Sequence, residues 1–323
     1  MGRFATALLL LWGVALAHPL AYAQSAFPAR PVRIVVPYPP GGATDVMARV
    51  IAQKLNEAWQ QPVVVENKPG ASGSVGSEIV ARSAADGYTL LHQGTQHAIN
   101  LSLYKKLPYD TVRDFAAVAY VASAPFLLVV HPSVPATSVR ELIAHIKSRP
   151  GGLNYGSSGV GGGAHLAGEI FKTAAGVSLT HIPYKGGAPA LADLLGGQLP
   201  IVFDPIPTSI HHVRNGKLRA LGITSARRSA LMPELPTVAE SGLPGFDVAA
   251  WFGLYAPAAT PRDVVVKVNA DVNRVLQLPE VREKFAALGA ESMPMDAGQF
   301  ATHLRAEIAK FAKAISDSGA TAE

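Results

Sequence analysis

Short runs of β-branched and other apolar residues alternate along the chain with segments whose apolar residues recur every three or four positions. The run 32–36 shows the first pattern, and the segment from Asp45 to Trp59 shows the second. Strands and helices that alternate with short connections are typical of parallel βαβ units, in which helices cover both faces of a sheet. The pattern predicts strands at 32–36, 62–66, 87–91, 126–130, 153–155, 179–183, 200–203, 218–224 and 246–255, and helices at 45–59, 74–84, 138–148, 188–195, 261–277, 279–288 and 298–316, with further helices that end near 175 and contain His211.

The strand–helix pattern restarts at Phe126, and a helical C-terminal segment follows the second series. Two such modules with a returning C-terminal segment indicate an α/β protein of two lobes, between which the chain crosses near 121–126 and 244–247. Clefts between lobes are a preferred place for small ligands, so the site is expected there. The predicted division is 24–123 with 247–323 for lobe 1 and 124–246 for lobe 2.

The N-terminus has the features of a secretory signal peptide. Arg3 supplies an early positive charge, an apolar run of about 13 residues follows, and the segment 1–23 ends on Ala21-Tyr22-Ala23, a pattern that signal peptidase accepts. A transmembrane anchor is the alternative, but the run is shorter than the roughly 20 residues needed to span a bilayer. We predict cleavage after Ala23 and a soluble product, beginning at Gln24, beyond the inner membrane.

Composition narrows the chemistry that this chain can carry. Cysteine is absent from the 323 residues, which excludes a disulfide scaffold, thiolate metal sites and cysteine catalysis. Hydrophobic residues make up 49% and charged residues 16%, so a folded core is expected rather than disorder. The formal net charge is +5, but Lys and Arg are scattered and form no basic helix, so surface charge explains it better than a nucleic-acid partner.

The first glycine-rich loop follows the strand 32–36 and opens the next helix. Its sequence, Val36-Pro-Tyr-Pro-Pro-Gly-Gly-Ala-Thr-Asp45, places two glycines directly before the helix. The first backbone N–H groups of a helix lack internal partners and lie at the positive end of the macrodipole. Such a loop suits a carboxylate or a phosphate. A tight turn in which Thr44 or Asp45 caps the helix explains this loop equally well.

A second glycine-rich loop, Tyr155-Gly-Ser-Ser-Gly-Val-Gly-Gly-Gly-Ala-His165, again lies between a strand and a helix. Its segment 159–164 fits the dinucleotide pattern G-x-G-x-x-A, but the acidic residue expected about 20 positions later is missing. The loop is better interpreted as a second anion cradle, to which Ser157 and Ser158 add hydroxyl groups. His165 lies in the first helical turn, where ligand contact and local packing are equally favoured.

Sequence patterns that support catalysis are absent. The chain holds no G-x-S-x-G elbow, G-x-x-x-x-G-K-[ST] loop or H-E-x-x-H motif, and its ten histidines do not gather with carboxylates at metal spacing. His211 and His212 are adjacent, so on a helix they diverge by about 100° and chelate poorly. Asp204 ends an apolar strand, where facing a cleft and capping the segment after Pro205 are equally favoured. We predict binding without chemistry, and without a metal or cofactor.

Segments between Arg30 and Pro257 carry a resemblance to a known family. In order they are Arg30-Pro-Val-Arg-Ile-Val-Val-Pro-Tyr-Pro-Pro-Gly-Gly-Ala-Thr-Asp45, Val65-Glu-Asn-Lys-Pro-Gly-Ala-Ser-Gly73, Asp86-Gly-Tyr-Thr-Leu90, Tyr155-Gly-Ser-Ser-Gly159, Pro183-Tyr-Lys-Gly186, Asp193-Leu-Leu-Gly-Gly-Gln198 and Trp251-Phe-Gly-Leu-Tyr-Ala-Pro257. By the ordered combination of these segments the chain resembles the Bug (TctC-like) family, the periplasmic solute-binding proteins of tripartite tricarboxylate transporters.

The resemblance implies a two-lobed, type II periplasmic binding-protein fold that closes around a small organic acid and has no catalytic activity. In the family the two glycine-rich loops hold one ligand carboxylate, mainly with backbone groups and partly through waters. A charged Asp45 or Asp204 would repel an anion, so both are expected to orient waters or backbone N–H groups. The ligand-binding residues carried over are Tyr38, Gly42, Ala43 and Asp45 in the first loop, Ser157, Gly161, Gly162 and His165 in the second, Thr95 in the loop Gln93-Gly-Thr-Gln96 after the third strand, and Asp204 in the pocket wall.

The leading hypothesis is a periplasmic receptor that captures a small mono-, di- or tricarboxylate and delivers it to a tripartite tricarboxylate-type membrane transporter. A sensor that signals to a membrane kinase would share the fold, and an exported enzyme is disfavoured because acid–base groups are missing. Binding proteins of this kind are usually monomeric, so a monomer is expected. Gln93 and Gln96 replace small polar residues common in the family, and 205–212 matches no ligand signature, which leaves the distal half of the ligand undetermined.

Overall fold

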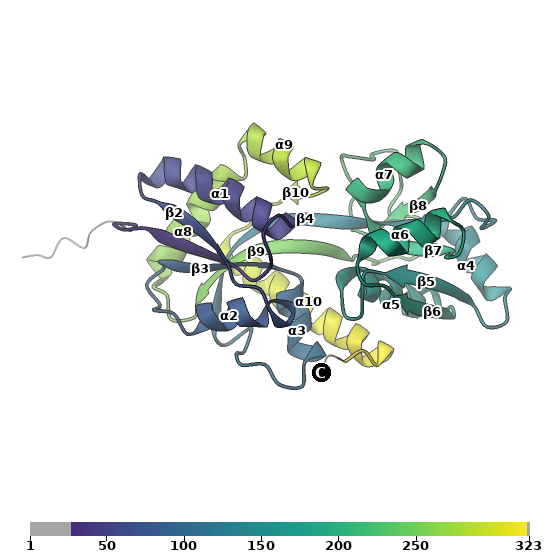
Figure 1. The fold of residues 1–323 in the computed structure, drawn as a ribbon, viewed down its shortest axis with the longest axis horizontal. Coiled ribbons are helices and arrows are strands. Elements are labelled where there is room, and N and C mark those ends of the chain that lie inside the picture. Colours follow the sequence, from purple (N-terminus) through teal and green to yellow (C-terminus); the bar gives the residue numbers. More distant parts are fainter. Residues whose placement is uncertain (1–26, 322–323) are drawn as a thin grey trace, which may run out of the picture.

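The computed structural model describes residues 27–321, so the predicted signal peptide at 1–23 lies outside the described residues. Figure 1 shows two α/β lobes side by side, joined by two long strands. Helices cover both faces of the sheet in each lobe, as expected for strands that are buried on both sides. Among residues 27–321, no helix is both long and apolar enough to cross a membrane.

Lobe 1 contains the N-terminal elements and the C-terminal helices. They are β1 (Val32–Val36), α1 (Ala43–Trp59), β2 (Val63–Asn67), η1 (Ala71–Gly73), α2 (Ser74–Ala81), β3 (Thr89–Gly94), α3 (Gln96–Leu103), the first part of β4 (Phe115–Val130), β9 (Ala249–Pro257), α8 (Arg262–Val275), α9 (Pro279–Ala287), β10 (Glu291–Ser292) and α10 (Ala297–Ser318). β1 pairs in parallel with β2 and β3, whereas β9 is antiparallel to β3 and β4. Because side chains alternate along β1, Ile34 packs with α1 and α8, and Val35 packs with α3 and α10.

Lobe 2 repeats the strand–helix alternation around the second part of β4. Its elements are α4 (Val139–Lys147), β5 (Leu153–Ser157), α5 (Gly163–Ala175), β6 (Leu179–Pro183), α6 (Gly187–Leu195), β7 (Ile201–Pro205), α7 (Ile206–Arg214) and β8 (Arg219–Ile223). β5 pairs in parallel with β6 and β7, and β4 is antiparallel to β7 and β8. Ser138 caps α4 by accepting a hydrogen bond from Glu141 N–H at 3.2 Å.

Both crossings between the lobes run through strands. β4 is 16 residues long; it pairs with β9 up to Pro125 and with β7 and β8 from Phe126 onward. The chain returns after β8 and enters β9, and the C-terminal helices complete lobe 1 (Figure 1). The result is the two-lobed α/β fold that the sequence predicts.

Some local predictions are wrong. The segment 115–125 continues the predicted strand 126–130 as one strand, and the strand predicted at 246–255 begins only at Ala249. The predicted loop from Gln93 to Gln96 is also wrong, because β3 runs through Gly94 and α3 begins at Gln96. The first part of β4 is rich in alanine and lacks a local pattern, so its strand conformation depends on pairing with distant β9.

Candidate ligand-binding cleft

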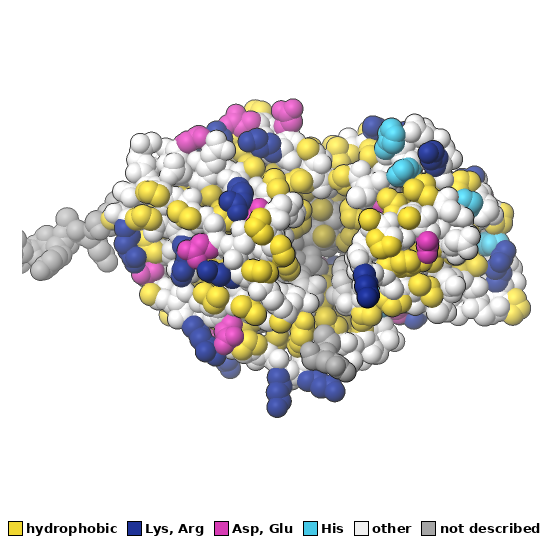
Figure 2. Space-filling model, in the orientation of Figure 1, with side chains coloured by type: hydrophobic (Ala, Val, Ile, Leu, Met, Phe, Trp, Pro, Cys, Tyr) yellow, Lys and Arg dark blue, Asp and Glu magenta, His cyan; other side chains and the backbone are white. Residues whose placement is uncertain are grey.

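A groove separates the two lobes, as Figure 2 shows, and a cavity of about 440 Å³ lies on its lobe-2 side. Phe126, Leu191 and Phe203 provide apolar walls, and Ser157 and Asp204 provide polar groups. Of the residues that line this cavity, all within the described part of the chain, none is a Lys, Arg or His. An anionic group bound here must therefore find its donors in the backbone or in neutral side chains.

The first glycine-rich loop brings the N-terminus of α1 to the side of lobe 1 that faces lobe 2 (Figure 1). Gly41 has a φ of +92°, and Gly42 is the N-cap residue, which provides no side-chain cap. Val46 N–H donates to Gly42 O at 2.9 Å, so the helical hydrogen bonds begin there. The N–H groups of Ala43 and Thr44 consequently have no partner within the helix.

The buried carboxylate of Asp45 is hydrogen bonded inside this loop. Its Oδ2 accepts from Gly41 N–H at 2.9 Å and from Arg49 Nε at 3.0 Å, and its Oδ1 accepts from Asn67 Nδ2 at 2.8 Å. Burial by itself raises the pKa of the Asp45 carboxyl, but these three hydrogen bonds lower the pKa to about 2. Asp45 is therefore ionised at neutral pH, and it orients a backbone N–H group of the loop.

The second glycine-rich loop has the same backbone arrangement at the N-terminus of α5. Gly161 has a φ of +74°, and Gly162 is the N-cap residue without a side-chain cap. Leu166 N–H donates to Gly162 O at 3.0 Å. The Gly161 N–H donates to Nδ1 of His165 at 3.1 Å, so the side chain four residues later is again the acceptor. His165 is thus engaged with the loop backbone.

Both N-cap glycines leave open space in front of the helices. A Cβ added to Gly42 meets no atom within 4 Å, and one added to Gly162 meets none nearer than Gly159 O at 3.8 Å. A Cβ added to Gly161, by contrast, would lie 2.6 Å from a methyl group of Leu103 on α3. Because Leu103 belongs to lobe 1, the second loop lies where the two lobes come close together.

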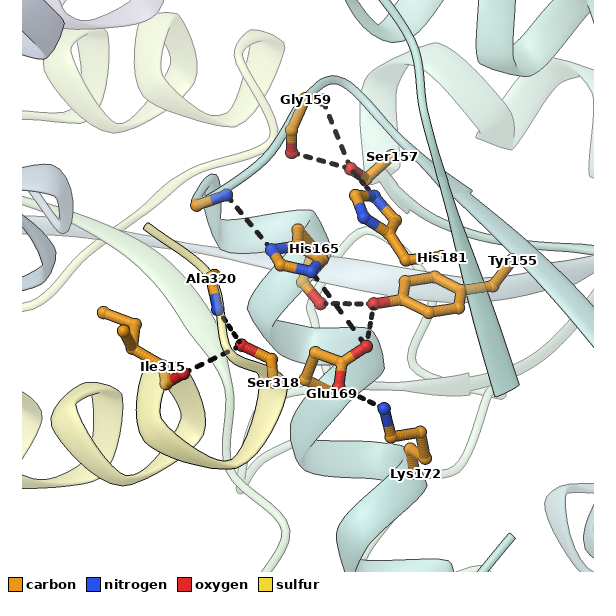
Figure 3. Close-up of polar contacts among 11 residues, drawn as sticks. Tyr155, Ser157, Gly159, His165, Glu169, Lys172, His181, Ile315, Ser318 and Ala320 are labelled. Carbon is orange, nitrogen blue, oxygen red and sulfur yellow. Dashed lines mark hydrogen bonds and ion pairs between the residues drawn. The ribbon is translucent and has the colours of Figure 1, made fainter. Parts of the chain in front are cut away.

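A cluster of aromatic and charged side chains lies behind the second loop (Figure 3). The His165 ring stacks on that of His181 of β6, with centroids 3.9 Å apart. Glu169, one turn after His165, accepts from Tyr155 Oη at 2.7 Å and pairs with Lys172 Nζ at 2.5 Å. In residues 27–321, no three His, Asp or Glu side chains are placed to hold a metal ion. His181 and Glu169 are not among the site residues predicted from the sequence, although Glu169 follows His165 at helical i, i+4 spacing.

Burial keeps the two stacked imidazoles uncharged. Desolvation lowers the pKa of His165, an effect that the Glu169 carboxylate opposes and Lys172 reinforces. Desolvation also lowers the pKa of His181 to about 4, with a further lowering from His165. At neutral pH the second loop is therefore supported by neutral side chains, whereas the first is supported by a carboxylate.

Tyr38 and Thr95 of the predicted set are engaged within lobe 1. Tyr38 Oη accepts from Gln93 Nε2 at 3.5 Å, and burial raises the pKa of Tyr38 to about 12. Thr95 Oγ1 accepts from Trp251 N–H at 2.8 Å, so this hydroxyl joins the end of β3 to β9. Gln93 itself is buried and accepts from Ser77 Oγ at 2.6 Å, which places it behind the first loop.

Ser157 and Asp204 are the predicted residues that line the lobe-2 cavity. Asp204 Oδ2 accepts from Ser209 Oγ at 2.6 Å and from Thr208 Oγ1, both in the first turns of α7. Burial raises the pKa of the Asp204 carboxyl, and the two hydroxyl donors oppose this change. Asp204 therefore lines the cavity and at the same time fixes the start of α7.

Comparisons with known proteins agree with this architecture. A profile described as "Tripartite tricarboxylate transporter family receptor" matches residues 47–320. The chain is 41% identical over 296 residues to protein BugT of Bordetella pertussis, and this match covers 91% of each chain. It is 39% identical to R. palustris Rpa4515, solved with adipate, with a TM-score of 0.75 and coverage of 91% of this chain and 99% of that one. It is 33% identical to MatC of Rhodopseudomonas palustris with bound malate, with a TM-score of 0.70 and coverage of 90% and 100%.

Proposed function

The chain belongs to the tripartite tricarboxylate transporter receptor family, and we propose that its interlobe groove holds a small organic carboxylate between the N-termini of α1 and α5. Members of this family are solute-binding receptors rather than enzymes. The role of the chain is accordingly that of a solute-binding receptor. The chemistry of its ligand and the residues that hold it belong to the proposal.

One observation carries the proposal: each lobe presents a helix N-terminus whose N-cap is a glycine. Gly42 precedes α1 and Gly162 precedes α5, and neither provides a side-chain cap. The first N–H groups of the two helices are consequently available to an anion, and both macrodipoles favour negative charge there. A carboxylate held by such donors needs no Arg or Lys, and waters can complete its hydrogen bonds.

The predicted residues have three different tasks in this site. Backbone N–H groups of Gly42, Ala43 and Gly162 receive the carboxylate, directly or through water. Supporting side chains hold the loop backbone next to these N–H groups in place, and side chains of lobe 2 line the cavity for the rest of the ligand. The supporting side chains are Tyr38, Asp45 and His165, the last of which accepts from the loop residue Gly161; the cavity residues are Ser157 and Asp204, and Thr95 joins the wall to β9.

The distal part of the ligand lies in the lobe-2 cavity. Its apolar walls at Phe126, Leu191 and Phe203 fit a hydrocarbon portion, which gains from leaving water. Two relatives are solved with small carboxylates, adipate in Rpa4515 and malate in MatC. We extend this chemical class, and neither particular acid, to the present chain.

Export and delivery complete the proposal. Segment 1–23 directs the chain to the periplasm, where related structures are described as a periplasmic transporter and as the periplasmic binding protein BugD. There the chain, a monomer without cofactor or nucleic-acid partner, hands its ligand to the membrane subunits of a tripartite transporter. Lobes 24–123 with 247–323 and 124–246 close because the ligand contacts both of them, which favours the closed state.

A thermal-unfolding screen tests the ligand class. The mature chain from Gln24 is unfolded, freed of any co-purified ligand and refolded, and is then screened with adipate, malate, aromatic acids, amino acids and inorganic phosphate. A ligand at 100-fold excess over its Kd adds about 2.7 kcal/mol to the free energy of unfolding, an easily measured rise in Tm. We expect at least one carboxylate to raise the Tm. A response to inorganic phosphate alone would contradict the proposal.

A further inference from the structure

Behind the second loop, the stacked rings of His165 and His181 form a support whose hydrogen-bond directions can be worked out. We propose that these two imidazoles are positioning residues, whose single protons set the shape of the loop that receives the carboxylate. The expected effect on affinity rests on the proposed function. The protonated positions of the rings and the hydrogen bond of Gly161 can be measured without any ligand.

The hydrogen bond of Gly161 determines which nitrogen of His165 carries a proton. A backbone N–H group can only donate, so Nδ1 of His165, 3.1 Å away, must present its lone pair. A neutral imidazole with a bare Nδ1 carries its proton on Nε2. In Figure 3 that nitrogen faces Glu169, whose Oε1 lies 4.0 Å away. His165 therefore supports the loop as a hydrogen-bond acceptor.

The hydrogen bonds of Ser157 indicate which nitrogen of His181 carries a proton. Its hydroxyl donates to Gly159 O at 2.9 Å and accepts from Gly159 N–H at 3.2 Å. A hydroxyl has one proton, and we assign it to the contact with Gly159 O, which makes His181 Nε2 the donor of its 2.7 Å contact with Ser157 Oγ. His181 therefore also carries its proton on Nε2, and it supports the loop as a donor.

The two rings hold the part of the loop whose backbone conformation favours glycine. Gly159 has a φ of +142° and Gly161 a φ of +74°. His165 supports Gly161 directly, and His181 supports Gly159 through Ser157. Since the rings stack at 3.9 Å with an interplanar angle of 28°, displacement of one removes the packing surface of the other. The backbone just before the N-cap of α5 then loses its support.

The charged groups around the rings balance one another. Glu169 and Lys172, both on α5, form an ion pair, and Tyr155 of β5 donates to the same carboxylate. The end of α10 and the residues after it lie beside the cluster in Figure 3, where Ser318 and Ala320 have side chains that do not ionise. The negative charge of Glu169 is thus balanced by Lys172 next to the rings. The hydrogen bonds of His165 and His181 are those of uncharged imidazoles.

Acid should release the loop. A second proton on His165 converts the acceptor of the Gly161 N–H into a competing donor, so the hydrogen bond cannot survive. Burial lowers the pKa of both rings, that of His181 to about 4. The support therefore persists at neutral pH, and ligand affinity should fall only under acidic conditions.

NMR of the ligand-free mature protein tests the structural part. Nitrogen-15 spectra should show both rings protonated on Nε2, and the Gly161 amide should exchange slowly with solvent. In His165→Leu the Gly161 exchange should accelerate about tenfold, the order of effect of one hydrogen bond. In His165→Asn, whose amide oxygen can accept the same N–H, it should stay within about threefold of the wild-type rate.

Calorimetry with adipate and malate tests the effect on affinity. His165→Leu should weaken binding about tenfold, and His165→Asn should restore most of it. His145→Leu is the matched control, because His145 is a partly buried histidine of α4 in the same lobe without a hydrogen bond to the loop. It should change neither Gly161 exchange nor affinity.

Different results would overturn the inference. A wild-type His165 protonated on Nδ1 excludes it, and this measurement needs no variant to fold. A loss of affinity in His165→Leu with unchanged Gly161 exchange would make His165 a direct ligand contact instead. If neither acid binds the wild-type protein, the proposed function loses support, whereas the ring protonation and the Gly161 exchange still decide this inference.

Discussion

The two glycine-rich loops share a backbone arrangement and differ in the side chains that support it. In each loop a glycine of positive φ donates its N–H to the side chain four residues later, and the next glycine is the N-cap. The acceptor is the Asp45 carboxylate in lobe 1 and the neutral His165 ring in lobe 2. Asp45 is paired with the half-exposed Arg49, whereas His165 is stacked on the partly buried His181.

This difference shows that both lobes require a backbone geometry rather than a particular side chain. A hydrogen-bond acceptor at the fourth position satisfies the glycine N–H whether it is charged or neutral. The supports of the two loops differ in their response to protons. The pKa of the acceptor Asp45 is about 2, whereas burial lowers the pKa of the acceptor His165 and lowers that of His181, stacked on it, to about 4. The lobes can therefore be tested separately by substitution and by pH.

The largest loss of carboxylate affinity is expected when a side chain fills the open space in front of one of the two helix N-termini. Gly162→Val places a side chain where an added Cβ meets no atom nearer than 3.8 Å, so the fold should persist while the methyl groups cover the N–H groups of α5. We expect the affinity for the carboxylate identified by the screen to fall at least about 100-fold, as for the loss of two charge-assisted hydrogen bonds. Calorimetry measures this affinity, and the Tm reports the fold.

Gly42→Val is the matched change in lobe 1, where an added Cβ meets nothing within 4 Å. Losses of similar size would establish that the two cradles contribute equally. Unchanged affinity in Gly162→Val would remove the second loop from the site.

Removing the Asp45 carboxylate, which supports the first loop, should lower the carboxylate affinity less than filling a loop does. Asp45→Ala leaves the Gly41 N–H without its acceptor, so we expect carboxylate affinity to fall about tenfold. Asp45→Asn keeps an oxygen that can accept this N–H, so the affinity should stay within about threefold of wild type. Equal losses in the two variants, measured by calorimetry, would show that the charge of Asp45 matters more than its hydrogen bond.

Acid should destabilise the two supports in different pH ranges. Because the folded pKa of His181 is lowered to about 4, the unfolded chain binds more protons below pH 6.5, and stability falls between there and about pH 4. The pKa of Asp45 is lowered from 3.8 to about 2, so the stability it contributes is present above pH 4 and is lost between about pH 4 and pH 2. Urea unfolding across this range measures both stages.

Variants test which support contributes to which stage of the acid-induced loss of stability. His181→Gln should reduce the first stage without removing it, since burial also lowers the pKa of His92 and His97. Asp45→Asn should reduce the second stage and leave the first unchanged. The assignment fails if either variant alters the stage of the other.

Salt concentration should have the smallest effect on ligand affinity. Neither cradle uses a Lys or Arg side chain toward the ligand in our proposal, and the residues that line the lobe-2 cavity in the described chain include no cation. Affinity should therefore change less than about threefold between about 50 and 500 mM NaCl, because backbone donors at short range are little screened. A stronger dependence in calorimetry would reveal a cationic side chain at the ligand.

The sequence predicts most elements and both loops because their signals are local. Helical periodicity locates α1, and Ser138 marks the start of α4. By contrast, α3 is short, and the first part of β4 depends on pairing with β9, more than a hundred residues away in the chain. Local patterns contain no information on such pairings, so these elements were not predicted.

The supports behind the loops show the same limit. Glycines and a helical turn indicate where an anion can be received, and His165 lies within that segment. His181 and Asn67 act on the loops from neighbouring strands, through β5–β6 and β1–β2 pairing. Their contribution depends on register between strands, which a single sequence does not specify. The predicted site residues stay a prediction until ligand binding is measured.

β4 also determines how force passes between the two lobes. This one strand is hydrogen bonded to β9 in lobe 1 and to β7 in lobe 2. A force on either lobe is therefore transmitted through a paired strand rather than through a flexible linker. Irregular pairing with β9 near Ala117–Ala122 gives this strand extra local twist. If the lobes close around a ligand as we propose, the motion must therefore twist or bend β4 itself.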